Sequence, residues 1–409
     1  MIKTTLGQVA DIITGPFGSS LHQYEYVSFG IPVIMPQDIG NRNLSYEKIA
    51  YITQEKANEL SRYLVDTNDI VYARRGDIEK HAFITDNDKG AICGTGCLRV
   101  RIMDKNVNPL FLSFYLNKPE TKKWISLHAV GSNMPNINTE ILSKVPIVLP
   151  DKKEQDSIAS FLDSIDNKIS NNNDICSDLE GMAKLLYNYW FVQFDFPDEN
   201  GKPYKSSGGK MVWNEELKRE IPDGWNLTTI GDITICHDSE RVPVASKDRE
   251  TMKGNIPYYG ATGIMGYVNS HIFDGDYVLM AEDGSIMDDK GYPILQRISG
   301  KTWVNNHAHV LEPIKGYSCK MLLMMFKDIP VRLIKTGSIQ MKINQDNMNA
   351  YKLIDIPETI KMKAQAILDR IDEQQLALQQ ENQELASLRD FLLPMLMNGQ
   401  VTVKKGETQ

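Results

Sequence analysis

The chain of 409 residues repeats one plan, in which a globular segment is followed by a long helix. Six landmarks occur in the same order in both halves, and ordinary strand and turn punctuation would explain one or two of them but not the order. Such a repeat predicts two similar domains, as the length also does. The pairs are Thr4–Ile12 with Thr228–Ile233, Gly30–Val33 with Asn255–Tyr258, Asp69–Asp77 with Asp276–Ser285, Gly131-Ser132 with Gly337-Ser338, Ile137-Asn138 with Ile343-Asn344, and Val145–Pro150 with Leu353–Pro357.

The helix after each globular segment carries a related motif, Leu162–Asp166 in the first half and Leu368–Asp372 in the second. Apolar residues recur there in steps of four and three, which predicts a coiled-coil seam. Each seam covers about 30 residues, or about 45 Å. Arg389 interrupts the second seam, and Pro394 is expected to end or kink its helix. The helix-pairing candidates are Ile158, Leu162, Ile165, Ile169, Asn172, Leu179, Leu186, Leu368, Ile371, Leu378, Asn382, Leu385 and Leu392.

A whole globular segment separates the two helices, so they can pair antiparallel. The expected fold is therefore of the mixed α+β class, with two β-rich α/β domains, two long antiparallel coiled-coil helices and a pseudo-twofold repeat. Asn172 and Asn382 lie near the middle of the seams, where a polar pair would fix the register; a locally solvated seam is the alternative. The expected boundaries are 1–150 for the first domain, 151–195 for the central helix, 196–225 for a loop-rich linker, 226–357 for the second domain, 358–397 for the C-terminal helix and 398–409 for a tail.

The charge of the chain is unevenly distributed. Its total is −8, but residues 1–150 carry 16 basic and 15 acidic residues (net +1), and residues 225–357 carry 14 and 15 (net −1). Residues 151–200 carry 4 basic and 11 acidic residues (net −7). Phosphates would repel that acidic segment, so DNA is expected to bind the globular parts. The N-terminus lacks a signal peptide and no run of eighteen apolar residues occurs, which predicts a cytoplasmic protein without a membrane partner.

Several catalytic and metal-binding patterns are incomplete. Asn108-Pro109-Leu110-Phe111 lacks the second proline of the adenine methyltransferase motif, and Gly300-Lys301-Thr302 lacks the upstream glycine of a P-loop. Acidic residues near Lys in 198–202 lie in the expected linker and do not make a nuclease centre. Cys93, Cys97 and His81 lack a fourth ligand for zinc. We therefore expect no catalytic residues, no metal and no cofactor on this chain.

Further motifs give the chain a family resemblance. They are the aromatic tract Tyr189–Phe196, the helix opening Glu154-Gln155 with Ile158-Ala159, the Gly224-Trp225 pair before Ile230–Asp232, and the segments Ile256–Ala261 and Ala281–Ser285. Together they resemble the specificity subunit of type I restriction-modification enzymes over nearly the whole chain. The second helix departs from the pattern, with Lys361-Met362-Lys363 where Glu-Gln is usual, which leaves its contacts at that end open.

The resemblance implies two target-recognition domains held apart by paired helices, each reading one half of a split, asymmetric site in double-stranded DNA. Two modification subunits, which bind S-adenosylmethionine and methylate adenine, would dock on the helices and domains. Restriction subunits, which use ATP and Mg for cleavage, would join them. Half-sites about 34 Å apart suit a helical spacer of this length. The aromatic tract must pack on something, and Tyr189, Trp190, Phe191 and Phe194 are candidates for partner docking.

The globular parts hold the DNA-binding candidates. Arg74 and Arg75 follow a strand in the first domain and suit guanine edges or phosphates, whereas the matching Glu282 and Asp283 suit cytosine. A coiled-coil scaffold that binds only protein is the alternative function. The full set of candidates is Ser19, Ser20, Arg74, Arg75, Lys80, His81, Ser132, Asn133, Arg241, Glu282, Asp283, Ser285, Arg297, His307 and Lys342.

Overall fold

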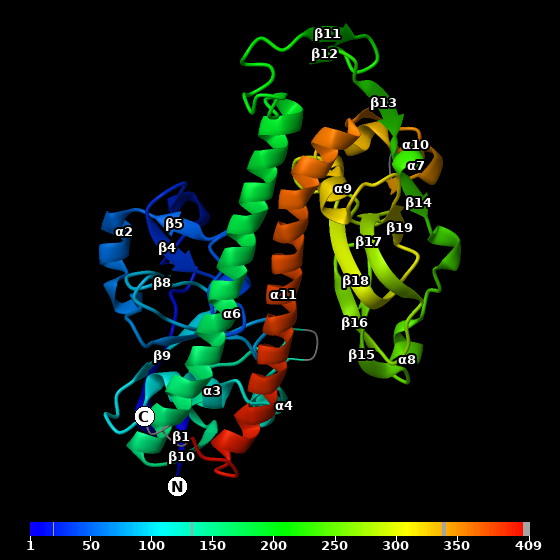
Figure 1. The fold of residues 1–409 in the computed structure, drawn as a ribbon. Coiled ribbons are helices and arrows are strands. Elements are labelled where there is room, and N and C mark those ends of the chain that lie inside the picture. The colour runs from blue at the N-terminus through cyan, green and yellow to red at the C-terminus, as the bar shows by residue number, and fades with distance from the viewer. Residues whose placement is uncertain (19, 132–133, 338–340, 404–409) are drawn as a thin grey trace, which may run out of the picture. The chain divides into compact units, whose positions relative to one another are not determined.

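The computed structural model describes residues 1–18, 20–131, 134–337 and 341–403. They form two compact units, one of residues Met1–Asn171 with Glu381–Gln409, and one of residues Asn172–Gln380. Each unit therefore contains one globular domain and a part of each long helix (Figure 1). Within the described residues, none of the helices combines the length and the apolar character that a membrane crossing needs.

Unit 1 is built on two four-stranded sheets, in the orders β2-β9-β6-β7 and β3-β5-β4-β8, and a short antiparallel pair, β1 with β10. Its largest core lies between the first sheet, helices α3 to α5 and the ends of the long helices that belong to this unit. The elements are β1 Ile2–Thr5, α1 Leu6–Val9, β2 Ala10–Thr14, β3 Tyr26–Val27, β4 Ile31–Ile34, β5 Ala50–Ile52, α2 Gln54–Glu59, β6 Ile70–Ala73, β7 His81–Phe83, β8 Ile92–Cys93, β9 Cys97–Ile102, α3 Pro109–Leu116, α4 Pro119–His128, α5 Thr139–Ser143 and β10 Pro146–Leu149.

Unit 2 contains a six-stranded sheet in the order β14-β19-β17-β18-β15-β16, with three short strand pairs beside it. Helix α9 packs its apolar side chains against this sheet. The elements are β11 Met211–Asn214, β12 Arg219–Pro222, β13 Asn226–Thr229, α7 Ile230–Ile233, β14 Thr234–Cys236, α8 Ser246–Arg249, β15 Lys253–Tyr259, β16 Ile264–Val268, β17 Phe273–Ala281, β18 Leu295–Val304, β19 Ala308–Pro313, α9 Cys319–Phe326, β20 Lys335–Thr336, β21 Lys342–Ile343, α10 Gln345–Asn349 and β22 Lys352–Asp355.

The predicted repeat is present at the level of strand pairing. Each domain opens with strand, short helix and strand (β1-α1-β2 and β13-α7-β14), and its first strand pairs with the last one, β10 or β22. The glycine of each opening helix lies against a second short helix, where a Cβ atom on Gly7 would come within 2.6 Å of Ser143 and one on Gly231 within 3.0 Å of Asn349. The repeated spacing in the sequence thus reflects one packing arrangement used twice.

The long helices are α6, Lys152–Tyr187, and α11, Glu358–Met397, drawn green and orange to red in Figure 1. Asp151 caps α6 by accepting a hydrogen bond from the Glu154 amide. In unit 1 the helices run antiparallel, because Asp166 pairs with Arg389 and Lys168 pairs with Glu381. The mixed fold with long antiparallel helices is confirmed.

Two local expectations differ from the structure. Helix α11 continues past Pro394 to Met397, so the proline does not end it. The proline removes only its own amide donor, and its carbonyl still accepts a hydrogen bond from the Asn398 amide (3.0 Å). The region expected to be a loop-rich linker contains the hairpin β11–β12. Its apolar side chains, Met211, Val212 and Ile221, pack with Phe194 and Phe196 into a small core of unit 2.

Candidate nucleic-acid interface

In unit 1, the candidates Arg74 and Arg75 lie at one edge of the sheet β2-β9-β6-β7, directly after strand β6. The register places the end of β2 and the start of β9 together, and the end of β6 beside them. The loop after β2 is held there because Thr95 donates a hydrogen bond to the Pro16 carbonyl. Gly15 must be glycine, since a Cβ atom would lie 2.1 Å from the Gly94 carbonyl oxygen.

Arg74 and Arg75 occupy the turn after β6 at this edge. The Arg74 carbonyl accepts a hydrogen bond from the Ile137 amide (3.0 Å), and Arg75 forms a β-bridge with Asn136. The Arg74 side chain donates to the Asn136 side-chain oxygen (3.3 Å). Arg75 is exposed and has no ion-pair partner among the described residues. Its guanidinium is therefore accessible to a ligand.

Unit 2 repeats this backbone arrangement with different side chains. The Glu282 carbonyl accepts a hydrogen bond from the Ile343 amide (2.8 Å), and Asp283 forms a β-bridge with Lys342. The side-chain pair across the bridge is Lys342 Nζ with Glu282 Oε1, at 2.5 Å. The Arg–Asn pair of the first domain is thus replaced by a Lys–Glu pair on the same frame.

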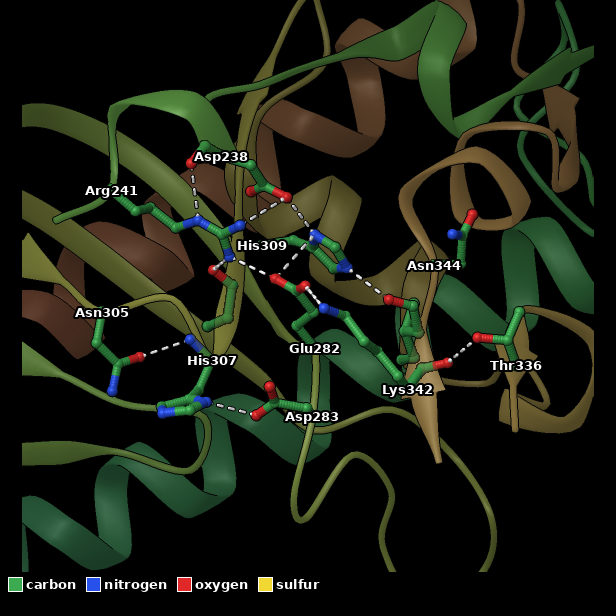
Figure 2. Close-up of polar contacts among 12 residues, drawn as sticks. Asp238, Arg241, Glu282, Asp283, Asn305, His307, His309, Thr336, Lys342 and Asn344 are labelled. Carbon is green, nitrogen blue, oxygen red and sulfur yellow. Dashed lines mark hydrogen bonds and ion pairs between the residues drawn. The ribbon is translucent and has the colours of Figure 1, made fainter. Parts of the chain in front are cut away.

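Behind this turn lies a buried network of charged groups, shown in Figure 2. Arg241 donates to Glu282 Oε2 (2.6 Å) and to the Ala308 carbonyl (2.7 Å), and it also pairs with Asp238 (3.2 Å). His309 contacts Asp238 Oδ2 through Nδ1 (2.5 Å) and the Ile343 carbonyl through Nε2 (3.1 Å). The four side chains are each at most 12% exposed. They hold the turn in place from within.

The electrostatics of the network favour charged carboxylates. Burial raises the pKa of Glu282, but its hydrogen bonds to Lys342 and Arg241 outweigh burial and leave that pKa lowered. The pKa of Asp238 is lowered in the same way, against burial, by His309 and Arg241. Both carboxylates therefore remain acceptors over the physiological pH range.

An outer layer of polar side chains is accessible in front of this network. His307 and Lys342 are exposed, and Asp283 is half-buried. His307 Nδ1 lies 2.6 Å from Asp283 Oδ1, and the His307 amide donates to the Asn305 side chain (2.9 Å; Figure 2). This layer offers a donor, an acceptor and a cation side by side, a combination suited to reading base edges and phosphates.

Cys236, Asp238 and His309 bring their donor atoms within 4.8 Å of one another. The group is already neutralised by protein charges, because Asp238 binds both Arg241 and His309 and also accepts a hydrogen bond from the Val310 amide. Burial, followed by the charge of Asp238, raises the pKa of the Cys236 thiol to about 12. A protonated thiol and an occupied carboxylate suit an ion-pair network better than a metal site.

Two candidates of the first domain occupy other surroundings. Lys80 is exposed and pairs with Asp77 (2.6 Å). His81 is buried, packs against Tyr72 with the two rings tilted, and contacts the Ser113 hydroxyl (3.1 Å). Burial and the nearby Arg42 and Lys122 lower the pKa of His81 to about 3, so its ring is neutral. It is a core group beneath the sheet edge and offers phosphate no charge.

The remaining candidates are placed as follows. Ser20 and Ser285 are exposed. Ser19, Ser132 and Asn133 lie outside the described residues. Arg297 lies in β18 and its guanidinium binds Asp372 of α11 (2.9 Å) and Asp276 (2.8 Å). It is therefore engaged within the protein.

None of the helix-pairing candidates of α6 and α11 is exposed. Ile158 and Leu162 are fully buried in the core of unit 1, as Leu368 is in that of unit 2. Asn172 is fully buried and Asn382 is half-buried. The buried members are Ile158, Leu162, Ile165, Asn172, Leu368 and Ile371. The half-buried members are Ile169, Leu179, Leu186, Leu378, Asn382, Leu385 and Leu392.

The aromatic tract after α6 packs mainly within unit 2. Phe191 is buried in the main core, and Phe194 lies in the small core beside Trp225, with ring centroids 5.9 Å apart. Trp190 is half-buried between the two cores. Tyr189 is 39% exposed, and the docking role of the tract stays a prediction.

Several residues that build these edges are not among the candidates predicted from the sequence. Asn136, Asp238 and His309 form the supporting contacts described above. Asn136 precedes the repeated Ile-Asn landmark and matches Lys342 of the second half, so the repeat itself could have identified it. Asp238 and His309 have no equivalent signal, because their partnership depends on strand register between β14 and β19.

Comparisons with known proteins agree with this geometry. The sequence model described as "Type I restriction modification DNA specificity domain" matches residues 3–180 and 222–387. The specificity subunit of the type I restriction enzyme MjaIX from Methanocaldococcus jannaschii is 26% identical, covering 93% of this chain and 89% of that protein. The HindI specificity subunit from Haemophilus influenzae is 20% identical, covering 82% and 87%.

A solved structure supports the fold independently. The S subunit of a type I restriction-modification system from M. genitalium superposes with a TM-score of 0.58 at 18% identity, covering 97% of this chain and 95% of that one. The two matches of the family model fall on the two halves of the repeat. The chain therefore belongs to the type I restriction-modification DNA specificity family, as a specificity subunit with two recognition domains.

Proposed function

We propose that the two sheet edges read the two halves of a bipartite, asymmetric site in double-stranded DNA. The observation that carries this proposal is that both edges share one backbone frame but present different polar pairs, Arg74–Asn136 and Glu282–Lys342. The same frame docks similarly on each half-site, and the exposed side chains that each frame carries select different bases. A protein-only scaffold would not need exposed polar edges of this kind.

The burial pattern selects among the candidate residues. Arg75 in the first domain and the layer of Asp283, His307 and Lys342 in the second are the groups we propose to contact DNA. Arg241 and Glu282 act from behind, by holding the turn that carries Asp283. The exposed cations suit phosphates or guanine, and the carboxylate suits cytosine.

Base-edge contacts can be tested by substituting one residue in each domain. In complex with its modification subunits, Arg75→Ala should weaken binding by about 1–3 kcal/mol and relax specificity in one half-site. Asp283→Ala should relax the other half-site. Competition binding with duplexes randomised in either half measures both effects.

Matched controls lie away from these two turns. Lys89 pairs with Asp66, before β6, and Asp274 is exposed near the start of β17. Lys89→Ala and Asp274→Ala remove the same charges away from the proposed edges, so they should leave both preferences unchanged. Equal effects of test and control variants would contradict the placement of the interface.

We also propose that modification subunits dock on exposed apolar faces of the long helices. In unit 2, Met182, Leu185 and Tyr189 lie three and four residues apart and are each at least 39% exposed. In unit 1, Leu388 and Phe391 of α11 are exposed in the same way. Exposed apolar stripes on helices are typical of protein interfaces. The partners would supply S-adenosylmethionine-dependent methylation, and restriction subunits would supply ATP- and Mg-dependent cleavage, with no catalytic residue on this chain.

Leu185→Glu tests the docking face, because it places a charge in the centre of the stripe. We expect binding of the modification subunit to weaken at least tenfold, as measured by titration calorimetry. Ser177→Glu, at an exposed polar position of the same helix, is the control. If Leu185→Glu binds as tightly as this control, the stripe is not a docking surface.

A further inference from the structure

Each recognition domain sends an arginine, whose side chain is at most 14% exposed, to the same position of the repeated helix motif. Asp166 ends the motif Leu162–Asp166 in α6, and Asp372 ends the motif Leu368–Asp372 in α11. Arg42 of the first domain pairs with Asp166 in unit 1, and Arg297 of the second domain pairs with Asp372 in unit 2. The two aspartates occupy equivalent positions of the repeat. The two arginines do not, because Arg42 lies in a loop after β4 and Arg297 lies in strand β18.

In unit 1 the arginine is fixed on every side. Arg42 donates through Nε to the Ser113 hydroxyl (3.0 Å), and its guanidinium lies 3.4 Å from the centre of the Phe114 ring. Asp166 also binds Arg389 of α11 (2.8 Å), so one carboxylate joins the domain to both helices. The Arg42 side chain is only 9% exposed.

The backbone of Arg42 adopts a conformation that is rare for its residue type. Its φ is +70°, in the left-handed region. Hydrogen bonds on both sides hold it there, from its amide to the His81 carbonyl (2.9 Å) and from the Phe83 amide to its own carbonyl (3.1 Å). A strained residue of this kind persists only where its surroundings determine its position. The direction of the arginine is therefore set by the β-sheet.

In unit 2 two cations of the domain reach the helices. Arg297 bridges Asp372 (2.9 Å) and Asp276 of β17 (2.8 Å). Lys320 of α9 is buried and donates to Glu180 of α6 and to Gln375 of α11, both at 2.6 Å. This domain is thus also tied to both helices, through other residues.

We propose that Asp166 and Asp372 are positioning residues that fix the angle of each recognition domain on its helices and so restrict the length of the DNA spacer that the protein accepts. This proposal rests on the proposed function, in which two edges read two half-sites. A change of one base pair moves a half-site by about 3.4 Å along the duplex and rotates it by about a tenth of a turn. A domain held by planar, hydrogen-bonded arginine–carboxylate pairs cannot follow that change, whereas a domain held by apolar contacts alone can rock toward it.

The test uses the full chain in complex with its modification subunits. Duplexes carry the two native half-sites with the native spacer or with one base pair more or fewer. The variant is Arg297→Met with Asp372→Asn, which removes both charges together and leaves neither buried alone. We expect the wild-type preference for the native spacer over its neighbours to fall at least fivefold in the variant, with the base preferences of both half-sites unchanged.

Two further variants separate positioning from stability. Ile298→Val, at the next residue of β18, loosens the core of the sheet around Phe273 and Leu279 without removing the Arg297–Asp372 pair, and should keep the wild-type spacer preference. Asp372→Glu, which retains the negative charge, should keep most of the spacer preference. Thermal unfolding must first show that the double variant is folded. If it then discriminates between spacer lengths as the wild type does, Asp372 is not a positioning residue. The proposal is equally wrong if Ile298→Val reduces the spacer preference to the same extent. A wild-type complex without any half-site or spacer preference would instead contradict the proposed function itself, and the spacer role with it.

Discussion

At the scale of single residues, charged side chains behind the recognition edge of the second domain hold that edge in place. Arg241 and Glu282 look like surface charges in the sequence, yet they are buried and bonded to each other. Removing one member of such a pair leaves the other without compensation in a poorly solvated place. Their role is to hold the turn, and the residues in front of them face the solvent.

Glu282→Gln should destabilise the second domain by about 2–4 kcal/mol, because it leaves the Arg241 guanidinium without one of its two carboxylates. Chemical denaturation at neutral pH measures this, with the neighbouring Asp283→Asn as a control that should cost less than about 1 kcal/mol. The folded pKa of Glu282 is lowered, so its contribution is present above the ordinary pKa of 4.5 and is lost as the pH falls through the folded value. The gap between wild type and variant should therefore close in acid; a constant gap would contradict the charged network.

His237 provides a second dependence on pH, of opposite sign. Its Nδ1 lies 2.6 Å from Glu240 and its Nε2 lies 2.7 Å from Glu312. Burial opposes the charged ring, but the two carboxylates outweigh it, so the pKa of His237 is raised above 6.5. Its contribution is thus fully present below pH 6.5 and is lost as the pH rises through the folded pKa.

We therefore expect His237→Asn to cost about 1–2 kcal/mol near pH 6 and clearly less at pH 9. Urea denaturation at the two pH values measures the difference. His271→Asn, at an exposed histidine, is the control and should show little effect at either pH. A cost that grows with pH would contradict the assignment.

At the scale of elements, each long helix begins with a side chain that donates a hydrogen bond to a backbone carbonyl of its domain, and the two helices use different residues for this. Gln155 of α6 donates to the Asn106 carbonyl (3.1 Å). Lys361, seven residues before the shared motif leucine as Gln155 is, donates to the Lys315 carbonyl (2.8 Å) and lies 4.2 Å from the centre of the Tyr317 ring. The second helix departs from the Glu-Gln pattern, but Lys361 takes the place of the glutamine as a buried side-chain donor to the domain.

Lys361→Ala should destabilise unit 2 by about 1–3 kcal/mol, because the Lys315 carbonyl loses a buried donor. Lys361→Gln should recover part of that loss, since glutamine performs the same task in α6. Guanidinium denaturation compares the two variants. If glutamine is as costly as alanine, the two helix starts are not functionally equivalent.

The sequence was most informative where a pattern repeats. The seven-residue seam predicted α6 and α11, and the landmarks predicted the strands that pair in each domain, because periodicity and order survive in a linear sequence. The hairpin β11–β12 was missed, since its glycine- and lysine-rich surroundings hide a few apolar residues whose core partners, Phe194 and Phe196, lie outside the hairpin.

The candidate site was predicted less completely than the fold. The turns with Arg74-Arg75 and Glu282-Asp283 lie at the sheet edges as their position after a strand suggests. The sequence does not reveal which of these charges are buried, because burial depends on partners such as Asp238 and His309 from distant strands. For the same reason Arg297 was expected to contact DNA, whereas it pairs with Asp372.

At the scale of the whole molecule, the chain combines a common frame with two variable edges. Both halves share a long helix, the opening strand-helix-strand unit, and an aspartate of the helix motif, Asp166 or Asp372, that pairs with an arginine of the domain. The polar pairs at the edges differ. A frame of this kind predicts a site whose two halves have unrelated sequences.

The most direct test of this claim is the motif that the complex methylates, determined by sequencing host DNA for modified adenine. The wild type is compared with a chimera in which residues 1–150 are taken from a relative with a different motif. The account predicts an asymmetric bipartite motif, of which the chimera changes one half and keeps the other half and the spacer. A palindromic wild-type motif, or a chimera that changes both halves, would contradict it.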